Sequence, residues 1–278
     1  MENLKTNAVT ALPLDTIGTI AITEIPIEDK KNAKQMAERI LAANKHLQSV
    51  YEKSGAMHGE YRVWKLRHLA GKKSTKTTYR ESDCLFELDV AKVYFSPRLA
   101  FERNRIAAQV QTGEKVLALF AGVGPFPIII AKKLKTQRKS AEIIANELNP
   151  IAVKYMQQNI TLNKVGEIVA VNKGDAKKLL KQKKKWANRI ITPLPHTAYK
   201  FLPQIIDATA VGGVVHLYGF GEHRNEKTKK KTNPFTALEK KIKVECRKKK
   251  RKCKIIFKRV VRPYSPFSVQ VVIDFIVK

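Results

Sequence analysis

The sequence is poor in the features that mark a secreted or membrane protein. Its 278 residues contain three cysteines, Cys84, Cys246 and Cys253, which are too few and too scattered for a disulfide framework. No apolar run is long enough to cross a bilayer. The first residues show no basic flank followed by an apolar core, as a secretion signal would. We therefore expect a reduced, cytoplasmic protein. No metal site is expected at Cys246 and Cys253, because no histidine or second cysteine pair accompanies them.

Negative charge is also scarce. Asp and Glu number 24 against 54 Lys and Arg, which gives a formal net charge of +30 at pH 7. Such an excess points to a polyanionic partner, and nucleic acid is the obvious one. A membrane surface is not favoured, because no amphipathic anchor segment stands out. Thermal habit or codon usage could also enrich lysine, but the ion-pair networks of thermophilic proteins need acidic partners that are few here.

The first third of the chain predicts a flexible lead-in, residues 1–11, followed by a small α+β domain, residues 12–96. The alternating, β-branched stretch "TIGTIAITEIPI" (16–27) predicts one strand. Apolar residues at helical spacing predict a helix over 29–53, with Met36, Ile40, Ala43 and Leu47 on one face. Short strand-like segments complete this domain.

From residue 97 to 278 the sequence pattern changes and predicts strands that alternate with helices. The strands are expected in "EKVLALFAG", "SAEIIANELNP", "EIVAVNKGD", "NRIITPLPH" and "GGVVHLYGF". The last segment, "CKIIFKRVVRPYSPFSVQVVIDFIVK", contains two strands with no helix between them. This order predicts an α/β domain whose doubly wound, mostly parallel sheet ends in a β-hairpin.

A glycine turn, "FAGVGPF" (120–126), joins the first of these strands to a helix. Gly122 and Gly124 let a ligand approach the main chain, and the helix offers N–H groups at its start. By itself the turn is weak evidence, because dehydrogenases use a similar one for a pyrophosphate. Phe126 stands where their third glycine would lie, and Pro125 removes one phosphate-binding N–H. These details argue against a dinucleotide as the ligand.

Two acids follow the next two strands at the same expected edge of the sheet. Glu147 lies 23 residues after Gly124 and can accept hydrogen bonds from a ribose diol. Asp175 could accept a hydrogen bond from the amine of adenine, or it could simply cap the next helix. A ribose acid and an amine acceptor without a pyrophosphate cradle describe an adenosine with a small tail. S-adenosylmethionine fits this description.

Several longer motifs carry a resemblance to a known family. They are "GEYR" (59–62), "DVAKVYFSPRLAFER" (89–103), "FAGVGPF", "NELNPIAV", "GDA" and "PLPHTAYKFLP" (193–203). In these motifs the chain resembles the archaeal and eukaryotic tRNA (guanine-37-N1)-methyltransferases, from about residue 14 to the end. The resemblance implies a class I, Rossmann-like methyltransferase domain that uses S-adenosylmethionine. It also implies a small domain that helps to hold the anticodon stem-loop of tRNA. We expect a monomer.

The resemblance also implies roles for individual residues. Glu102 matches the residue regarded as the general base, and Arg62 matches an arginine beside the target base. Taken singly, Glu102 could instead pair with a neighbouring arginine, and Arg62 could be a cation on the surface of a strand. Pro193 is a catalytic-site candidate in the "PLP" loop, where it changes how the substrate is held. The cofactor contacts that it implies are Tyr94, Arg98, Arg103, Phe120, Ala121, Gly122, Gly124, Glu147, Leu148, Asp175, Ala176, Pro193, Leu194 and Pro195. Guanine N1 must lose a proton as it accepts the methyl group, and a carboxylate can take that proton. A guanidinium could stabilise negative charge at O6.

The chain departs from the family pattern in three places. Pro193 stands where most of the family carries asparagine, and an archaeal wyosine-pathway branch looks similar at this loop. That branch is associated with a second methylation, at C7 of 4-demethylwyosine, so we hold a dual activity as a hypothesis. Ala118 replaces an acid that is usual in the first strand. The N-terminal domain that contacts the tRNA elbow is expected to be missing.

Three other interpretations stay open at this point. The aminocarboxypropyl transferase of the same pathway uses the other arm of the same cofactor, but Glu102 and "PLPH" look like the methylating branch. A basic RNA-binding protein with an inactive cofactor fold would explain Pro193 and Ala118. A nicotinamide dehydrogenase is the most distant of the three.

Overall fold

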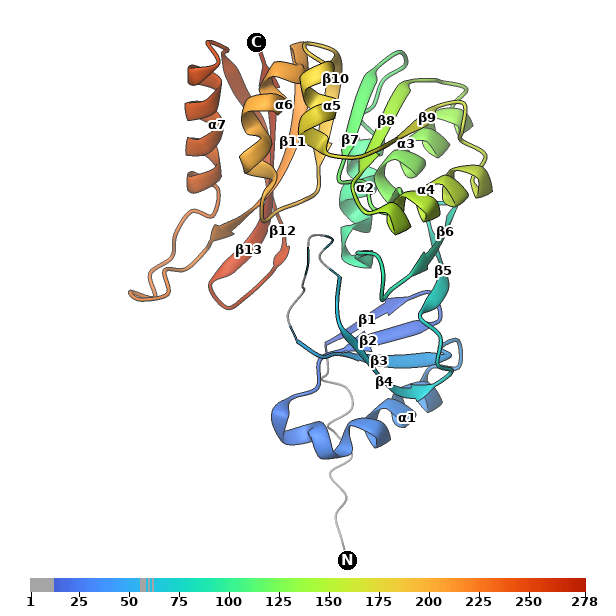
Figure 1. Cartoon of the computed structure of the whole chain (residues 1–278). Coiled ribbons are helices and arrows are strands. Elements are labelled where there is room, and N and C mark those ends of the chain that lie inside the picture. Colours follow the sequence, from blue (N-terminus) through green and yellow to red (C-terminus); the bar gives the residue numbers. More distant parts are fainter. Residues whose placement is uncertain (1–12, 56–58, 60, 62) are drawn as a thin grey trace, which may run out of the picture. The chain divides into compact units, whose positions relative to one another are not determined.

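The computed structural model describes residues 13–55, 59, 61 and 63–278 and divides the chain into two compact units, Met1–Pro97 and Arg98–Lys278 (Figure 1). The predicted flexible segment 1–11 lies outside the described residues. None of the described helices is both long and apolar enough to pass through a membrane.

The first unit is built on a four-stranded sheet in the order β1-β2-β3-β4. The strands are Leu14–Ile17, Ile20–Thr23, Ser49–Lys53 and Leu66–Gly71. Only β2 and β3 pair in parallel. Helix α1 (Ala33–Ala43), after the 3-10 turn Ile27–Asn32, packs its buried side chains with those of the sheet. A separate hairpin, β5 (Lys76–Glu81) and β6 (Cys84–Asp89), completes the unit.

Two sequence predictions in this unit were wrong in detail. The stretch 16–27 is not one strand, because Gly18 turns the chain at φ 55° and a Cβ there would lie 2.3 Å from the carbonyl oxygen of Thr78. The helix predicted over 29–53 ends at Ala43, where the Asn44 side chain donates to the carbonyl of Ile40. Its last part is β3, which pairs with a neighbour on each side. Leu47 follows the helix but is buried in the same cluster as the helix residues. Its apolar spacing therefore extended the predicted helix too far.

The second unit contains a seven-stranded sheet in the order β12-β13-β11-β10-β7-β8-β9. The bounds are β7 Lys115–Leu119, β8 Glu142–Glu147, β9 Val169–Lys173, β10 Ala187–Thr192, β11 Thr209–Glu222, β12 Cys253–Pro263 and β13 Ser268–Val277. Strands β7 to β11 pair in parallel, whereas β13 is antiparallel to both β11 and β12. The predicted parallel sheet with a terminal hairpin is therefore confirmed.

Helices cover both faces of this sheet, as right-handed crossovers require when the strand order reverses after β9. Helices α3 (Pro125–Thr136) and α4 (Pro150–Leu162) connect strands on one side of the reversal, and α2 (Ala100–Ala107) packs against α3. Helices α5 (Ala176–Gln182) and α6 (Leu202–Ala208) follow the reversal, and α7 (Thr236–Lys248) packs beside α6.

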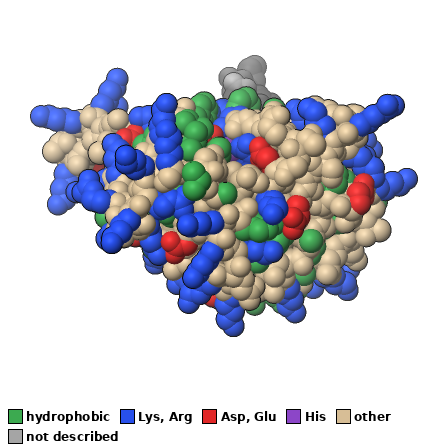
Figure 2. Space-filling model, turned by 90° about the horizontal axis from the view of Figure 1, so that it is seen from above, with side chains coloured by type: hydrophobic (Ala, Val, Ile, Leu, Met, Phe, Trp, Pro, Cys, Tyr) green, Lys and Arg blue, Asp and Glu red, His purple; other side chains and the backbone are tan. Residues whose placement is uncertain are grey.

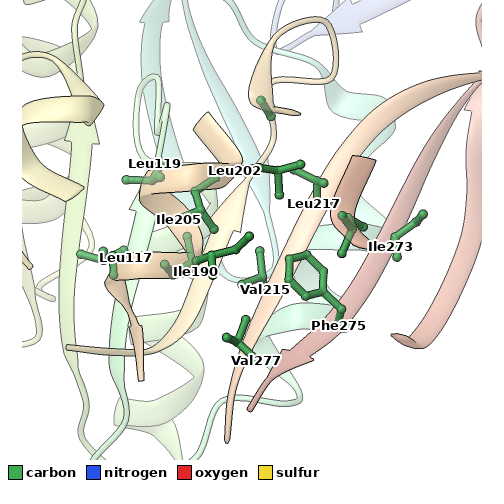
Figure 3. Close-up of a cluster of buried hydrophobic side chains, with 14 of the residues drawn as sticks. Leu117, Leu119, Ile190, Leu202, Ile205, Val215, Leu217, Ile273, Phe275 and Val277 are labelled. Atoms are coloured by element: carbon green, nitrogen blue, oxygen red, sulfur yellow. The ribbon is translucent and has the colours of Figure 1, made fainter. Parts of the chain in front are cut away.

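The core under α5, α6 and α7 fixes the strands that carry the site (Figure 3). Its fully buried members include Leu117, Leu119, Ile190, Val215, Leu217, Ile273, Phe275, Val277, Leu202 and Ile205. Burying a side chain of this kind stabilises the fold by about 1.5–3 kcal/mol. Because the side chains of a strand alternate between faces, the residues between these positions point to the opposite face, toward α2 and α3.

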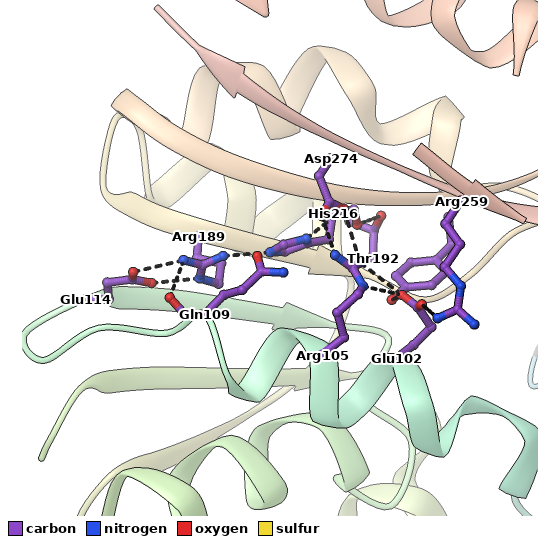
Figure 4. A network of polar contacts seen from close by, with 10 residues as sticks. Glu102, Arg105, Gln109, Glu114, Arg189, Thr192, His216, Arg259 and Asp274 are labelled. Atoms are coloured by element: carbon purple, nitrogen blue, oxygen red, sulfur yellow. Dashed lines mark hydrogen bonds and ion pairs between the residues drawn. The ribbon is translucent and has the colours of Figure 1, made fainter. Parts of the chain in front are cut away.

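On that opposite face, polar residues form a connected network beside buried apolar side chains such as Val116 and Ala118 (Figure 4). Glu114 accepts two hydrogen bonds from Arg189, at 2.7 and 2.9 Å. Arg189 Nη1 lies 2.8 Å from Nε2 of His216. Nδ1 of His216 lies 2.8 Å from Oδ1 of Asp274, within ion-pair distance but outside regular hydrogen-bond geometry. Asp274 in turn pairs with Arg105 of α2.

The contacts of His216 define which nitrogen of its ring carries the proton. A guanidinium can only donate, so Nε2 of His216 must accept from Arg189 and the proton must reside on Nδ1, facing Asp274. A protonated ring would turn a donor toward the guanidinium. Burial lowers the pKa of His216 below 6.5; Asp274 opposes this shift and Arg189 adds to it. The imidazole is therefore neutral in the folded protein at neutral pH.

The low pKa of His216 makes the stability of this unit depend on pH. The unfolded chain takes up a proton near pH 6.5 that the folded chain does not bind. The unfolding free energy should therefore fall as the pH decreases below that value, by up to about 1.4 kcal/mol per pH unit. The variant His216→Gln removes this contribution. Urea unfolding from about pH 7.5 to about pH 5, followed by Trp186 fluorescence in a Trp64→Phe background, measures both slopes.

The exposed His46 offers a matched control, because His46→Gln removes an imidazole that is not buried. We expect this variant to keep the wild-type slope. Equal slopes for the wild type and His216→Gln would contradict a neutral buried imidazole.

Candidate active site at the carboxyl edge of the sheet

The parallel strands of the second unit bring most of the predicted site residues to one edge. Strands β7, β8, β9 and β10 end at Leu119, Glu147, Lys173 and Thr192, and their carboxyl ends share an edge because they run in the same direction. The predicted residues at this edge are Phe120, Ala121, Gly122, Gly124, Glu147, Leu148, Asp175, Ala176, Pro193, Leu194 and Pro195. Open α/β sheets bind their ligands at this edge.

The glycine turn follows β7 and adopts a backbone that glycine favours. Gly122 has φ 58° and Gly124 has φ 90°, and Gly124 is the N-cap of α3. A Cβ on Gly124 would lie 2.8 Å from Cδ1 of Ile128 and 3.0 Å from Cγ of Met156. A side chain there would therefore push α3 away from α4. The turn keeps bare main chain at the edge, as the sequence predicted.

Glu147 is held in place by the main chain around it. Its Oε2 accepts a hydrogen bond of 2.8 Å from the N–H of Gly122, and its Oε1 accepts bonds of 2.8 Å from the N–H groups of Leu148 and Asn149. A carboxylate offers about four acceptor positions, so the three donors leave room for one further donor. The fixed, half-buried carboxylate beside the bare turn fits a ribose hydroxyl.

Asp175 caps α5, as the simpler of the two interpretations predicted. Its Oδ1 accepts a hydrogen bond of 2.8 Å from the N–H of Lys177, and the residue is exposed. The preceding Gly174 donates its N–H to the carbonyl of Glu147, so the two acids stand at neighbouring strand ends. The cap does not exclude a contact with adenine, because capping occupies only one oxygen. Leu148, 39% exposed, adds an apolar surface between them.

Glu102, the predicted general base, is the most buried acid of the site, with 1% of its side chain exposed (Figure 4). Its Oε2 accepts hydrogen bonds from Arg105 at 3.0 Å and from the hydroxyl of Tyr218 at 2.8 Å. Its Oε1 accepts one bond, at 3.0 Å, from Arg259 of β12. Burial, and then the charge of Glu102, raise the pKa of Tyr218 well above its usual range, so that the phenol stays a donor.

Tyr218 also connects Glu102 to the cofactor edge. Its ring packs edge-on against Phe126, with the ring centroids 6.2 Å apart, and Phe126 lies in the first turn of α3 directly after the glycine turn. The buried carboxylate is thus one aromatic ring away from α3, the helix that Gly124 caps. This arrangement brings an acid of the type needed for proton transfer close to the expected cofactor site.

The loop after β10 is apolar where it meets this edge. Pro193, Leu194 and Pro195 are half-buried, and the N–H of Leu194 donates to the carbonyl of Thr192 at 2.8 Å. Thr192 is fully buried and donates its hydroxyl to the carbonyl of His216. The strand end is therefore rigid, whereas the side chain of Pro193 offers no hydrogen bond to a substrate.

For the remaining predicted residues the structure gives burial but few contacts. Arg103 is buried next to Glu102 on α2, and Arg98 is exposed at the start of the second unit. Tyr94 lies in the first unit and is 37% exposed. Arg62 lies outside the described residues. Ala118 is buried in the middle of β7.

Sequence reasoning anticipated one partner of Glu102 and missed two. Arg105 lies three residues away on the same helix, and Glu102 forms with it the ion pair to a neighbouring arginine that the sequence allowed. Tyr218 and Arg259 lie more than 100 residues away, and no local pattern points to them. The described residues contain no group of acidic, His or Cys side chains that could hold a metal ion.

Comparison with known proteins assigns the family. The model of the TRM5/TYW2 methyltransferase domain matches residues 77–256. The tRNA (guanine(37)-N(1))-methyltransferase Trm5b of Pyrococcus abyssi is 41% identical over 267 residues, which cover 94% of this chain and 73% of that protein. The tRNA 4-demethylwyosine(37)-methyltransferase Taw21 of Saccharolobus solfataricus is 32% identical, over 94% of this chain and 92% of that protein. The tRNA (guanine(37)-N(1))/4-demethylwyosine(37)-methyltransferase Taw22 of Nanoarchaeum equitans is 45% identical over 54% of this chain and 48% of that protein.

Solved structures agree with this assignment. Trm5b from Pyrococcus abyssi superposes with a TM-score of 0.83 and 41% identity, over 96% of this chain and 75% of that one. A complex of aTrm5 with tRNALeu gives 0.79 and 31%, over 96% and 72%. Methanocaldococcus jannaschii Trm5 with adenosine gives 0.77 and 32%, over 96% and 74%. The expected class I methyltransferase fold is confirmed. The chain belongs to the TRM5/TYW2 methyltransferase family.

Proposed function

We propose that this protein transfers a methyl group from S-adenosylmethionine to N1 of guanine 37 in tRNA. The observation that carries the proposal is the position of Glu102. A buried carboxylate contacts Tyr218, which packs on the helix that begins at the glycine turn. A base for the guanine proton and a site for an adenosine-type cofactor are thus neighbours. Relatives named as methyltransferases of this nucleotide support the choice of substrate.

The residues at the strand ends fit S-adenosylmethionine. The bare backbone of 120–124 would face the ligand, and Glu147 has room for one further donor, which suits a ribose hydroxyl. Leu148 would lie against the adenine, with Asp175 and Ala176 at its amine and the loop 193–195 closing the pocket. Tyr94, Arg98 and Arg103 are further contacts of this proposal. When bound, the cofactor supplies a methyl group on a positively charged sulfur. An adenosine complex of a relative supports this placement.

The surroundings of Glu102 indicate which oxygen meets the guanine. Oε2 is occupied by Arg105 and Tyr218, whereas among the described residues Oε1 accepts a hydrogen bond from Arg259 alone. Oε1 is therefore the oxygen with room to accept the N1 proton of guanine. As that proton leaves, negative charge moves to O6 of the base, which Arg62 is proposed to stabilise. The target base must leave the anticodon loop to reach this pocket.

The other interpretations of the sequence are now less favoured. An RNA-binding protein without activity would have no need to bury a carboxylate between two guanidinium groups at a cofactor edge. The aminocarboxypropyl transferase remains a distinct activity within the same family. The two are separated by the mass of the product, because a methyl group and an aminocarboxypropyl group differ in mass.

Specific observations favour a second methylation as well. Pro193, Leu194 and Pro195 give the pocket an apolar wall with no side-chain donor to read the edge of a guanine. A tricyclic base derived from guanine can pack against such a wall. One relative, Taw22, is named for both activities, and another, Taw21, is named for the second alone. We therefore propose that 4-demethylwyosine is a second substrate, methylated at C7 to give isowyosine.

The role of Glu102 predicts a large loss of turnover in Glu102→Gln. Removing a general base lowers kcat by roughly 10²–10⁴-fold, while the affinities for tRNA and cofactor should change little. Single-turnover methyl transfer to a tRNA transcript measures the loss. Tyr218→Phe is the matched control, because it removes a donor to Oε2 but keeps the carboxylate; it should cost less than about tenfold. A folded Glu102→Gln protein with wild-type kcat would exclude this base.

The role of Glu147 predicts weaker cofactor binding. Loss of a hydrogen bond to a charged acceptor should raise the Kd for S-adenosylmethionine by about 10- to 150-fold in Glu147→Ala. Calorimetry measures this without any turnover. Glu142→Gln changes an exposed acid at the other end of the same strand and should leave the Kd unchanged. An unchanged Kd in Glu147→Ala would refute the ribose contact.

The second activity is tested with two substrates. We expect nucleoside mass spectrometry to show 1-methylguanosine from a tRNA transcript with guanine at position 37, and isowyosine from tRNA that carries 4-demethylwyosine. Pro193→Asn restores the amide usual in the family and should lower the second activity relative to the first. Absence of isowyosine would limit the enzyme to guanine, and an aminocarboxypropyl product would overturn the proposed reaction.

A further inference from the structure

Three aromatic rings meet at the carboxyl edge of the sheet, outside the cofactor site. His196 lies in the loop after β10, Phe220 lies near the end of β11, and Tyr264 follows β12 in the turn to β13. Strand register places them together, because Glu222 at the end of β11 pairs with Ser268 and Pro263 pairs with Val269. His196 follows Pro195 directly, so the rings adjoin the loop proposed to hold the target base.

The rings form one continuous surface. The centroids of His196 and Phe220 are 4.4 Å apart, those of Phe220 and Tyr264 are 4.2 Å apart, and those of His196 and Tyr264 are 5.6 Å apart. His196 and Phe220 are half-buried, whereas Tyr264 is 51% exposed. The outermost ring is therefore supported from below but open to a ligand.

The hairpin turn does not need the Tyr264 ring to keep its shape. The N–H of Tyr264 donates to the carbonyl of Ser268 at 3.0 Å, and the hydroxyls of Ser265 and Ser268 bond to each other at 2.8 Å. Main-chain and serine contacts thus define the turn. An exposed aromatic ring that the fold does not require is more readily explained by binding.

A basic segment lies beside the rings. Residues 224–231 contain Arg224, Lys227, Lys229, Lys230 and Lys231, all exposed, against one acid, Glu226. The segment is tied to the hairpin by the N–H of His223, which donates to the carbonyl of Phe267. The Nζ of Lys229 lies 4.4 Å from the centroid of the Phe267 ring. Aromatic rings next to exposed cations are the elements that bind single-stranded nucleic acid.

Positive charge alone would not distinguish this edge of the sheet as a site for RNA. Lys and Arg side chains also cover the face seen in Figure 2, which is turned toward the other end of the strands, with few acids among them. Lys181, in the last turn of α5, and Lys184 and Lys185, between α5 and β10, are exposed at that end. The open ring of Tyr264 with two rings beneath it is what distinguishes the carboxyl edge.

We propose that Tyr264, supported by Phe220 and His196, stacks on a base next to the target nucleotide in the anticodon loop, and that the lysines of 224–231 bind the adjoining phosphates. This inference rests on the proposed function. When the target base leaves the loop, its neighbours lose a stacking partner, and an aromatic side chain replaces it. Stacking on a ring tolerates any base, so this contact would not depend on the identity of the neighbouring nucleotide.

The stacking contact is tested by a double-mutant cycle. Tyr264→Leu, which keeps an apolar side chain, should raise the Kd for an anticodon stem-loop by about 5- to 150-fold. Tyr264→Phe should bind like the wild type. Stem-loops with an abasic site on the 5′ or on the 3′ side of the target nucleotide remove the partner base. For the abasic stem-loop that lacks the stacked base, the wild type and Tyr264→Leu should have equal Kd values.

The phosphate contacts are tested by salt dependence. Replacing Lys229, Lys230 and Lys231 with Gln should reduce the slope of log Kd against log salt concentration by about two, at about 0.7 for each single-strand phosphate. The same change at Lys181, Lys184 and Lys185 should leave the slope unchanged. Cofactor affinity by calorimetry and thermal unfolding of every variant should match the wild type.

The outcomes separate this inference from the proposed function. If the wild type binds and methylates the stem-loop but Tyr264→Leu binds it equally well, the stacking role is wrong and the function stands. If neither abasic stem-loop abolishes the difference, Tyr264 acts on the protein rather than on a base, which also overturns the inference. If the wild type neither binds nor methylates the stem-loop, the proposed function itself fails.

Discussion

The buried negative charge of Glu102 is the constraint on which the polar interior of the second unit depends. A carboxylate removed from water must be paired, since an isolated charge costs several kcal/mol to bury. Arg105 and Arg259 supply that pairing, but Arg105 is itself 11% exposed and is balanced by Asp274. Asp274 then meets His216, and beyond it Arg189 needs Glu114, which is 15% exposed. One buried acid therefore explains polar or charged positions in β10, β11, β12 and β13.

The two acids of the site are held in different ways, and the difference suits their proposed roles. Glu147 is surrounded by neutral N–H donors of the main chain, which fix its geometry and leave one position for a hydroxyl. Glu102 is surrounded by side chains, two of them cationic, that reach it from α2, β11 and β12. A contact that must only hold a ligand is well served by rigid backbone. A group that must accept a proton benefits from side chains that can adjust as its charge changes.

Local patterns predicted the second unit well and the first unit less well. Strand–turn–helix alternation, the glycine turn and strand-end acids are short-range signals, so the sheet, its edge and Glu147 could be derived from sequence. The strand Ser49–Lys53 was mistaken for helix, because Leu47 continued a helical spacing that chain reversal at Asn44 interrupts. Glu102 came from family resemblance, not from any pattern. Its partners Tyr218 of β11 and Arg259 of β12 are brought close only by the order of the sheet, in which β13 lies between β11 and β12.

A surface as basic as this one raises the question of how RNA is held in one register. Contacts between lysine and phosphate bring affinity but carry little positional information, because every nucleotide offers the same phosphate. A net charge of +30 would attract a tRNA to many orientations. Register must come from contacts that only one arrangement can satisfy, such as the proposed contact between the target base and Oε1 of Glu102. A second base on Tyr264 would fix the loop at two points along the same sheet edge, and two points define a direction. The apolar wall at Pro193 can then tolerate different target bases, because their placement depends on the neighbours as well as on the pocket.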